Sequence, residues 1–191
     1  MSANQEKQQS KTLLDILREE KADKYQGGIY HKTQIDLTYH PNHMKGSRLT
    51  LKNGTSDSRK DWFAVGDYKK MPNGVGGMEI TLPEQVSGKI KKLLAEYNAK
   101  EEKSLEDILD FHVKFERIHP FQDGNGRVGR LIMFQECMKY NIVPFIIEDD
   151  LKMFYYRGLK EWDNEKGYLT DTCLTAQDRY KAYLDYFRID Y

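Results

Sequence analysis

The chain has 191 residues, and its 30 basic and 30 acidic side chains give a formal net charge of zero. This length suits one catalytic domain rather than two. A neutral chain gives no electrostatic reason to expect a nucleic-acid or anionic-membrane partner. No apolar stretch approaches the roughly 20 residues that span a bilayer, and residues 1–11 are too polar for a signal peptide. We therefore expect a cytoplasmic globular protein.

The chain begins with a polar tract and continues into helical patterns. Residues 1–11 are rich in Gln, Lys and Ser, so we expect them to be disordered. Leucine and isoleucine at helical spacing predict a helix over residues 12–20, which a glycine pair then ends. A second helix is predicted over residues 34–44, although Pro41 fits only a first helical turn or forces a kink.

Two short apolar runs in the middle of the chain have the composition of strands. They are residues 63–65 and 78–81, and the segment between them, 71–77, is rich in glycine, proline and asparagine. Short apolar runs around such a tip are typical of a β-hairpin. The sequence therefore predicts a hairpin over residues 63–81.

The rest of the chain has helical periodicity. Thr81 is the expected N-cap of a helix that buries an apolar face including Leu94, and Ser104 is the expected N-cap of the next. That helix ends at Ile118, before a proline. The predicted helices begin near Pro83, Ser104, Gly124, Asp149 or Asp150, and Leu174. The fold class is therefore mainly α, with one small hairpin.

The loop between the second and third of these helices has the composition of a phosphate site. His119 precedes a proline, which should place it just beyond the helix end with its ring available. Gly124, Asn125 and Gly126 then open the next helix. Residues without a Cβ let successive N–H groups converge on one anion, and the helix end adds positive potential. These features predict a phosphate cradle.

Two arginines lie at positions where a helix without a bound anion disfavours a cation. Arg127 and Arg130 lie in the first turns of the predicted helix, where the macrodipole opposes cations by roughly 0.3–1 kcal/mol each. Their spacing of three places both guanidinium groups on one face, where they can clamp adjacent phosphates. Asp123 would repel bare phosphates, but it becomes favourable if Mg²⁺ bridges them. We therefore expect a nucleoside triphosphate with a divalent metal, Mg²⁺ or Mn²⁺, held in part by Asp123.

The same loop contains a candidate base. An imidazole has an unperturbed pKa of about 6.5, so His119 suits proton removal from an attacking hydroxyl near neutral pH. The nucleophile would attack one phosphorus in line while the cradle and the arginines stabilise the growing charge. Each feature alone is common in ordinary loops, but their combination predicts group transfer.

Residues 119–130 resemble the signature of Fic-domain proteins of the Fido superfamily, His-Pro-Phe-x-Asp/Glu-Gly-Asn-Gly-Arg-x-x-Arg, at every defined position. The resemblance extends from about Tyr39 to the C-terminal helices, and the length is similar to that of compact bacterial members. It implies one mainly helical Fic domain over residues 12–191. The catalytic helix-loop-helix would cover residues 104–140, with Phe121 facing the core.

The resemblance also implies an activity. Family members commonly transfer AMP from ATP, with Mg²⁺, to Ser, Thr or Tyr hydroxyls of proteins. Matched by position, His119 would be the base and Asp123 the metal ligand, the 124–126 segment would bind phosphate, and Arg127 and Arg130 would hold the outer phosphates. The hairpin would be the flap that docks an extended target segment. The flap residues expected to contact the target are Lys70, Met71, Asn73, Gly74 and Val75.

One segment departs from the family pattern. Many members inhibit themselves with a helix carrying Ser/Thr-x-x-x-Glu-Gly/Asn, whose Glu pairs with the last signature arginine. The matching stretch lies within residues 38–50, where Pro41 replaces Ser/Thr and Lys45 replaces Glu. We therefore expect Lys45 not to restrain Arg130, which favours transfer over nucleotide removal. The alternative is that another acidic residue, within 161–165, takes the role.

Several residues support only weaker expectations. Tyr155, Tyr156 and Leu159 are candidates for binding the base, with core packing as the alternative at this helical spacing. Cys137 and Cys173 lack metal-ligand spacing and are expected to be reduced and buried. The alternatives to AMP transfer are transfer of another nucleotide or phosphate group, or nucleotide binding without turnover. The partners expected are ATP and a protein with an accessible hydroxyl, and self-modification and oligomers stay open.

Overall fold

The structure is a computed structural model that describes residues 11–44, 67–73 and 80–191, with the backbone alone for 38–44. Within these ranges the chain is helical, with no strand. Its seven helices are α1 (Leu13–Ala22), α2 (Ile29–Met44), α3 (Pro83–Asn98), α4 (Leu105–Ile118), α5 (Asn125–Lys139), α6 (Lys152–Glu161) and α7 (Gly167–Tyr186). A short 3₁₀ helix, η2 (Asp149–Leu151), precedes α6. None of the helices in the described ranges combines the length and apolarity that a membrane span requires.

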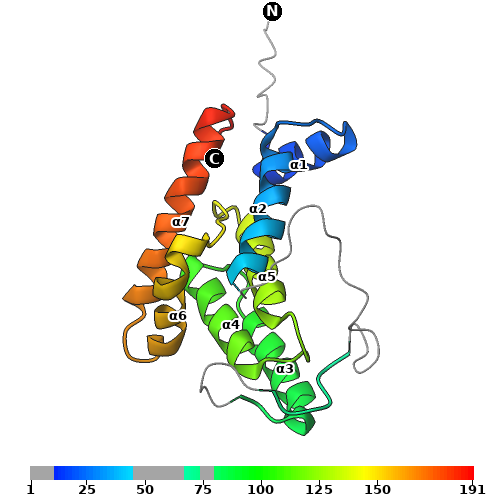
Figure 1. Ribbon diagram of the computed structural model, residues 1–191, viewed down its shortest axis with the longest axis vertical. Helices are drawn as coiled ribbons and strands as arrows, with labels where there is room; N and C mark the ends of the chain where they lie inside the picture. The colour runs from blue at the N-terminus through cyan, green and yellow to red at the C-terminus, as the bar shows by residue number, and fades with distance from the viewer. Residues whose placement is uncertain (1–10, 45–66, 74–79) are drawn as a thin grey trace, which may run out of the picture.

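Helices α4 and α5 lie at the centre of the molecule (Figure 1). One apolar cluster joins them to α6 and α7 around the fully buried Trp162, and a second joins them to α3 around Val86. A third cluster, around Ile29 and Leu184, joins α5 to α1, α2 and α7. The loop between α4 and α5 therefore leaves and enters helices that are packed on several sides.

The start of α4 is fixed by a local capping box, as the sequence predicts. The Ser104 hydroxyl accepts from the Asp107 main-chain N–H at 3.3 Å, while the Asp107 carboxylate accepts from the Ser104 N–H at 2.8 Å. These bonds satisfy donors that the first helical turn leaves without partners. They also hold the pKa of the Asp107 carboxyl below its usual range, together with a contact from Lys100.

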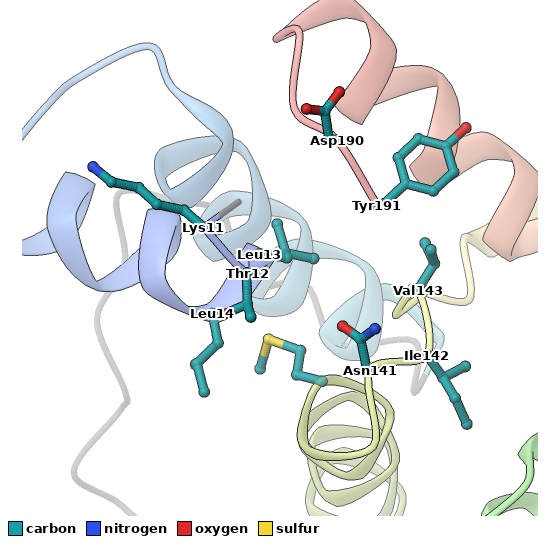
Figure 2. A pocket seen from close by; sticks show the side chains of 10 residues that line it. Lys11, Thr12, Leu13, Leu14, Asn141, Ile142, Val143, Asp190 and Tyr191 are labelled. Atoms are coloured by element: carbon teal, nitrogen blue, oxygen red, sulfur yellow. The ribbon is translucent and has the colours of Figure 1, made fainter. Parts of the chain in front are cut away.

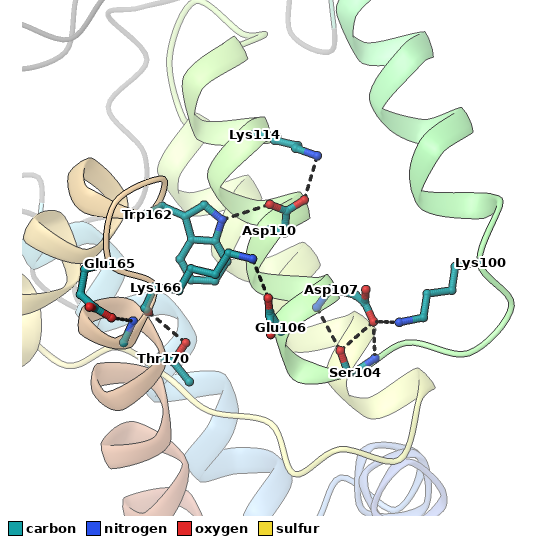
Figure 3. A network of polar contacts seen from close by, with 11 residues as sticks. Lys100, Ser104, Glu106, Asp107, Asp110, Lys114, Trp162, Glu165, Lys166 and Thr170 are labelled. Atoms are coloured by element: carbon teal, nitrogen blue, oxygen red, sulfur yellow. Dashed lines mark hydrogen bonds and ion pairs between the residues drawn. The ribbon is translucent and has the colours of Figure 1, made fainter.

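The α6–α7 turn is tied to the first half of α4 (Figure 3). The Trp162 indole N–H donates to the Asp110 carboxylate at 3.0 Å, and the Lys166 ammonium contacts Glu106 at 2.6 Å. Farther along the two helices, a Cβ on Gly158 would lie 2.6 Å from the Leu169 Cα. Helix α6 therefore approaches α7 as closely as a glycine permits.

The predicted hairpin is wrong for the part of it that the structure describes. Residues 67–73 and 80–81 contain no strand. The main-chain N–H of Lys69 instead donates to the Pro120 carbonyl at 2.8 Å, and that of Met71 donates to the Gln122 side chain at 3.2 Å. These groups bond to the α4–α5 loop rather than to a partner strand. Positions 63–66 and 74–79 lie outside the described residues, as do residues 1–10, for which disorder was predicted.

Two helices begin earlier than the sequence predicts. Helix α2 starts at Ile29 because the Glu20 carboxylate, from α1, accepts from the Tyr30 main-chain N–H at 2.8 Å. Pro41 lies in the last turn of this helix rather than the first. Helix α7 starts at Gly167, seven residues before the predicted start, because a buried face that includes Leu169 packs against α6.

Details of packing differ from the sequence prediction at α3. Its N-cap is Leu82 rather than Thr81, and no side chain caps it. Leu94 is 44% exposed rather than buried. Both cysteines are free and buried, as predicted, and burial raises the pKa of the Cys137 thiol to about 12.

Candidate functional site

His119 lies at the C-terminal end of α4 in a left-handed conformation, with φ of 52° and ψ of 60°. Its ring Nδ1 is 3.3 Å from the Glu116 carbonyl oxygen. Since a carbonyl can only accept, this bond puts the proton of the neutral ring on Nδ1 and its lone pair on Nε2. The arrangement supplies the nitrogen that a general base requires, on a backbone that the end of α4 holds.

The loop after His119 is held by one buried side chain. The Asn125 amide oxygen accepts from the Phe121 main-chain N–H, and its amide nitrogen donates to the Phe121 carbonyl, both at 2.7 Å. Asn125 is fully buried, and the Phe121 ring packs against the apolar cluster around Val86. The sequence predicted Asn125 as part of the phosphate cradle, and the structure gives its side chain a bracing contact within the loop.

Gly124 begins α5 in a conformation that favours glycine. Its φ is 86°, and it is the N-cap of the helix without a side-chain cap bond. The main-chain N–H groups at a helix start have no partners within the helix, and the helix dipole adds positive potential there. The start of α5 therefore has main-chain N–H groups that could bind an anion, and the predicted phosphate cradle stays a prediction.

The two arginines fold back toward these glycines. The Arg127 Nη2 atom is 3.6 Å from the Cβ position of Gly124, and the Arg130 Nη1 atom is 3.2 Å from that of Gly126. Arg130 is 7% exposed, and no carboxylate of the described residues pairs with it. A buried guanidinium without a carboxylate partner is costly unless an anion joins it.

Asp123 lies beside Arg127, with Oδ2 and Nη2 3.6 Å apart. Both side chains are partly exposed, so this ion pair contributes little to stability. No cluster of three His, Cys, Asp or Glu side chains suited to a metal occurs in the described ranges. One carboxylate fits Mg²⁺ if phosphate oxygens supply further ligands. The donor set of the loop is therefore compatible with a metal that arrives with a phosphate ligand.

Residues 67–73 of the predicted flap are bound to the loop. The Lys69 ammonium donates to Asn73 at 2.9 Å and lies 3.5 Å from the Ile118 carbonyl at the C-terminal end of α4, where the helix dipole favours a cation. Burial lowers the pKa of Lys69. The Asn73 amide donates to the Phe121 carbonyl at 3.0 Å.

The flap residues predicted to contact a target therefore fall into three groups. Asn73 bonds to the loop, whereas Lys70 and Met71 are exposed, and Gly74 and Val75 lie outside the described residues. Lys45, at the predicted regulatory position, also lies outside them.

The predicted role in base binding is not supported for Tyr155 and Leu159. Both are buried in the cluster around Trp162, which agrees with the core-packing alternative. The Tyr155 hydroxyl is 2.7 Å from Nε2 of His112, which is also buried. Tyr156 is 39% exposed and stays a candidate.

The sequence did not single out Lys69, Gln122 and His112. His112 is seven residues before His119, on the buried face of α4, and this polar residue on an apolar face was the available signal. Lys69 has no comparable signal, because the partners that join it to α4 and to the α4–α5 loop lie about 50 residues away.

Two hollows among the described residues are lined by none of residues 119–130. One, of about 240 Å³, lies between the start of α1, the end of α5 and the C-terminus (Figure 2). The other, of about 610 Å³, is an open groove between the 80–82 segment, α3 and α4. The candidate site is thus identified by its polar groups.

The comparisons with known proteins agree with this geometry. The protein adenylyltransferase Fic of Drosophila grimshawi is 31% identical over 98 residues, which are 50% of this chain and 20% of that protein. The protein of the same name from Drosophila virilis is 45% identical over 49 residues, 26% of this chain and 10% of that protein. The matched regions cover a fifth or less of these relatives.

The fold itself has a solved counterpart. A Fic-domain-containing signaling protein from Bacteroides thetaiotaomicron matches 90% of each chain with a TM-score of 0.59 and 19% sequence identity, which shows a common fold. The model of the Fic/DOC family matches residues 31–137, which are more than half of the chain and include the whole His119–Arg130 segment. The chain, with its helical fold and glycine-rich loop, is therefore a member of the Fic/DOC family.

Proposed function

We propose that this protein transfers AMP from ATP to Ser, Thr or Tyr hydroxyls of a target protein. One observation supports this most strongly: the guanidinium of Arg130 is buried beside Gly126, and no carboxylate of the described residues pairs with it. A triphosphate at the start of α5 would place negative charge beside this guanidinium. Distant relatives named protein adenylyltransferase Fic support AMP as the transferred group.

The proposed step is a single displacement at the α-phosphorus. The target hydroxyl gives its proton to Nε2 of His119 as its oxygen bonds to phosphorus, and the bond to the pyrophosphate oxygen breaks. Pyrophosphate leaves, and the target carries AMP. The N–H groups at the start of α5, with Arg127 and Arg130, stabilise the negative charge on the phosphates. Bound Mg²⁺, held in part by Asp123, would neutralise phosphate charge.

The target would lie beside the exposed part of the 67–73 segment. Lys69 and Asn73 form hydrogen bonds to the loop that follows His119, while Lys70 and Met71 are exposed to solvent. An extended target segment bonded along this stretch would bring its hydroxyl toward His119. Gly74 and Val75 would complete the docking surface.

Intact mass measurement after incubation with ATP and Mg²⁺ tests the proposal. We expect AMP to be added to a target or to the chain itself, and His119→Ala to lower the rate by about 10²–10⁴-fold, since a positioned base contributes that much. His31→Ala, on α2, is the matched control and should keep the rate. Addition of phosphate or of another nucleotide would contradict AMP transfer and identify the group that is transferred instead. ATP binding without any added mass would indicate a binding module.

We further propose that the chain lacks the inhibitory contact of compact bacterial relatives that have an inhibitory helix, because Lys45 stands at the position of their glutamate. A lysine cannot pair with Arg130 and would attract a triphosphate. Lys45→Glu should therefore lower transfer from α-labelled ATP, whereas Lys91→Glu, on the exposed side of α3, should not. Equal labelling by all three proteins would contradict the proposal.

A further inference from the structure

A buried polar pair lies beneath the candidate phosphate site. The hydroxyl of Tyr155 on α6 and Nε2 of His112 on α4 are 2.7 Å apart, and both residues are essentially inaccessible to solvent. Gly129 on α5 lies against His112, since a Cβ there would be 3.0 Å from the His112 Cε1 atom. The pair therefore joins three helices at the point where α5 carries its second signature arginine.

The Arg130 guanidinium rests between this pair and the loop. Its Cζ atom is 5.8 Å from the centre of the Tyr155 ring, and its Nη1 atom is 3.2 Å from the Cβ position of Gly126. Its Nε atom has no hydrogen-bond partner in the described residues. The aromatic face below and the glycine above thus restrict the orientation of a side chain that would otherwise have several rotamers.

The pair is suited to lie beside a cation. Burial, and then the nearby Arg130, lower the pKa of His112 to about 3, so its ring is neutral at ordinary pH and does not repel the guanidinium. Burial raises the pKa of Tyr155 well above its usual value, so the phenol stays protonated and can donate to Nε2 of the neutral His112 ring. The bond to His112 fixes the direction of the Tyr155 hydroxyl, which also interacts with the Arg130 side chain.

We propose that Tyr155 and His112 are positioning residues that hold Arg130 in the orientation needed to bind the triphosphate of ATP. This inference rests on the proposed function, because it assumes that Arg130 binds phosphate. It assigns to Tyr155 a part in ATP binding that does not require contact with the base.

Tyr155→Phe in the full chain removes only the hydroxyl and keeps the ring. We expect the KM and the Kd for ATP to rise about tenfold while kcat falls less than about twofold, because Arg130 loses the hydroxyl that helps to hold its orientation. Tyr180→Phe is a matched control: its hydroxyl makes a buried bond of the same length, 2.7 Å, with Thr33 in the cluster around Ile29 and Leu184. This control should lower thermal stability similarly and leave the KM for ATP unchanged.

A second variant tests the pair itself. His112→Phe should raise the KM as much as Tyr155→Phe does, and the double variant should add no more, since both remove one shared bond. His112→Gln, which keeps a side-chain partner for the hydroxyl, should recover most of the affinity. A KM unchanged in Tyr155→Phe, or equal losses in Tyr155→Phe and Tyr180→Phe, would overturn the inference.

Calorimetric titration with ATP separates this inference from the proposed function. If the unaltered chain binds ATP without transferring AMP, the proposed function fails and the Kd values of the variants still decide the positioning role. If the unaltered chain does not bind ATP, both are overturned. If it transfers AMP and the Tyr155→Phe affinity is unchanged, only the positioning role is lost.

Discussion

The loop between α4 and α5 and the contact between α6 and α7 each depend on a glycine, for opposite reasons. Gly124 has a φ of 86°, and the nearest atom to its Cβ position is the Arg127 Nη2 at 3.6 Å, so conformation is the constraint there. Gly158 is an ordinary helical residue whose Cβ would lie 2.6 Å from the Leu169 Cα, so space is the constraint. One glycine shapes the site, and the other brings two helices together.

This difference means that damage to the site and damage to the fold can be separated. The loop is held mainly by short-range bonds such as those from Asn125 to Phe121. The helix pair is held by apolar packing between segments that the α6–α7 turn connects. The two regions meet where Tyr155 of α6 bonds to His112 of α4. Substitutions in each region should therefore change different measurable quantities.

The largest loss of stability is expected for Gly158→Ala. The new methyl group would meet main-chain atoms of Leu169, which cannot move aside as a flexible side chain can. We expect the free energy of unfolding to fall by about 3 kcal/mol, measured by urea denaturation, while the KM for ATP of the folded protein stays unchanged.

Gly88→Ala is the control for this substitution. Gly88 lies on α3 with no atom within 4 Å of its Cβ position, so alanine should stabilise the protein by about 0.5–1 kcal/mol. A destabilisation of similar size in both variants would show that glycine at 158 is not required by close packing.

The junction of the two regions should be sensitive to acid. His112 has a pKa of about 3 in the folded protein, against about 6.5 in an unfolded chain. As the pH falls below 6.5, His112 binds a proton in the unfolded chain but stays neutral in the folded protein. The free energy of unfolding therefore decreases between pH 6.5 and 3. The loss from this group is about 2 kcal/mol between pH 7 and pH 5.

Urea denaturation at the two pH values measures this loss. His112→Gln should reduce the difference between them, whereas His31→Gln, on the partly exposed side of α2, should not. An identical pH dependence in the unaltered chain and His112→Gln would mean that other groups cause the acid sensitivity.

The smallest loss of stability is expected for Gly124→Ala. Alanine has room at this position but disfavours a positive φ, at a cost of about 1 kcal/mol. Transfer should fall more than stability, because any change of the loop backbone turns the N–H groups of the phosphate cradle. Gly124→Asn, which tolerates this conformation better, should retain more activity. If Gly124→Ala keeps full activity, the left-handed geometry is not needed by the site.

Much of the candidate site could be predicted because its signals are local. A proline after His119, glycines at the start of α5 and a cap at Ser104 each act over a few residues, and the structure has the end of α4, the start of α5 and the Ser104 cap where the sequence predicts them. The chemical roles of these residues stay predictions.

Other parts could not be predicted because their causes are distant in the chain. Helix α2 begins at Ile29 because Glu20, from another helix, caps it. The 67–73 segment contains no strand and instead bonds to Pro120 and Phe121. Tyr155 was a candidate for base binding until the packing of α6 placed it in the core.

The sequence alone therefore determined the helical class, the loop between α4 and α5, and the residues that we propose bind phosphate there. Only the tertiary structure decided that Lys69 bonds to that loop and that Tyr155 and His112 lie under Arg130. The physical reason is the separation along the sequence over which each interaction acts. Backbone preferences and caps depend on neighbours within one or two turns, whereas a contact between distant helices depends on how their buried faces pack together, and no local pattern records it.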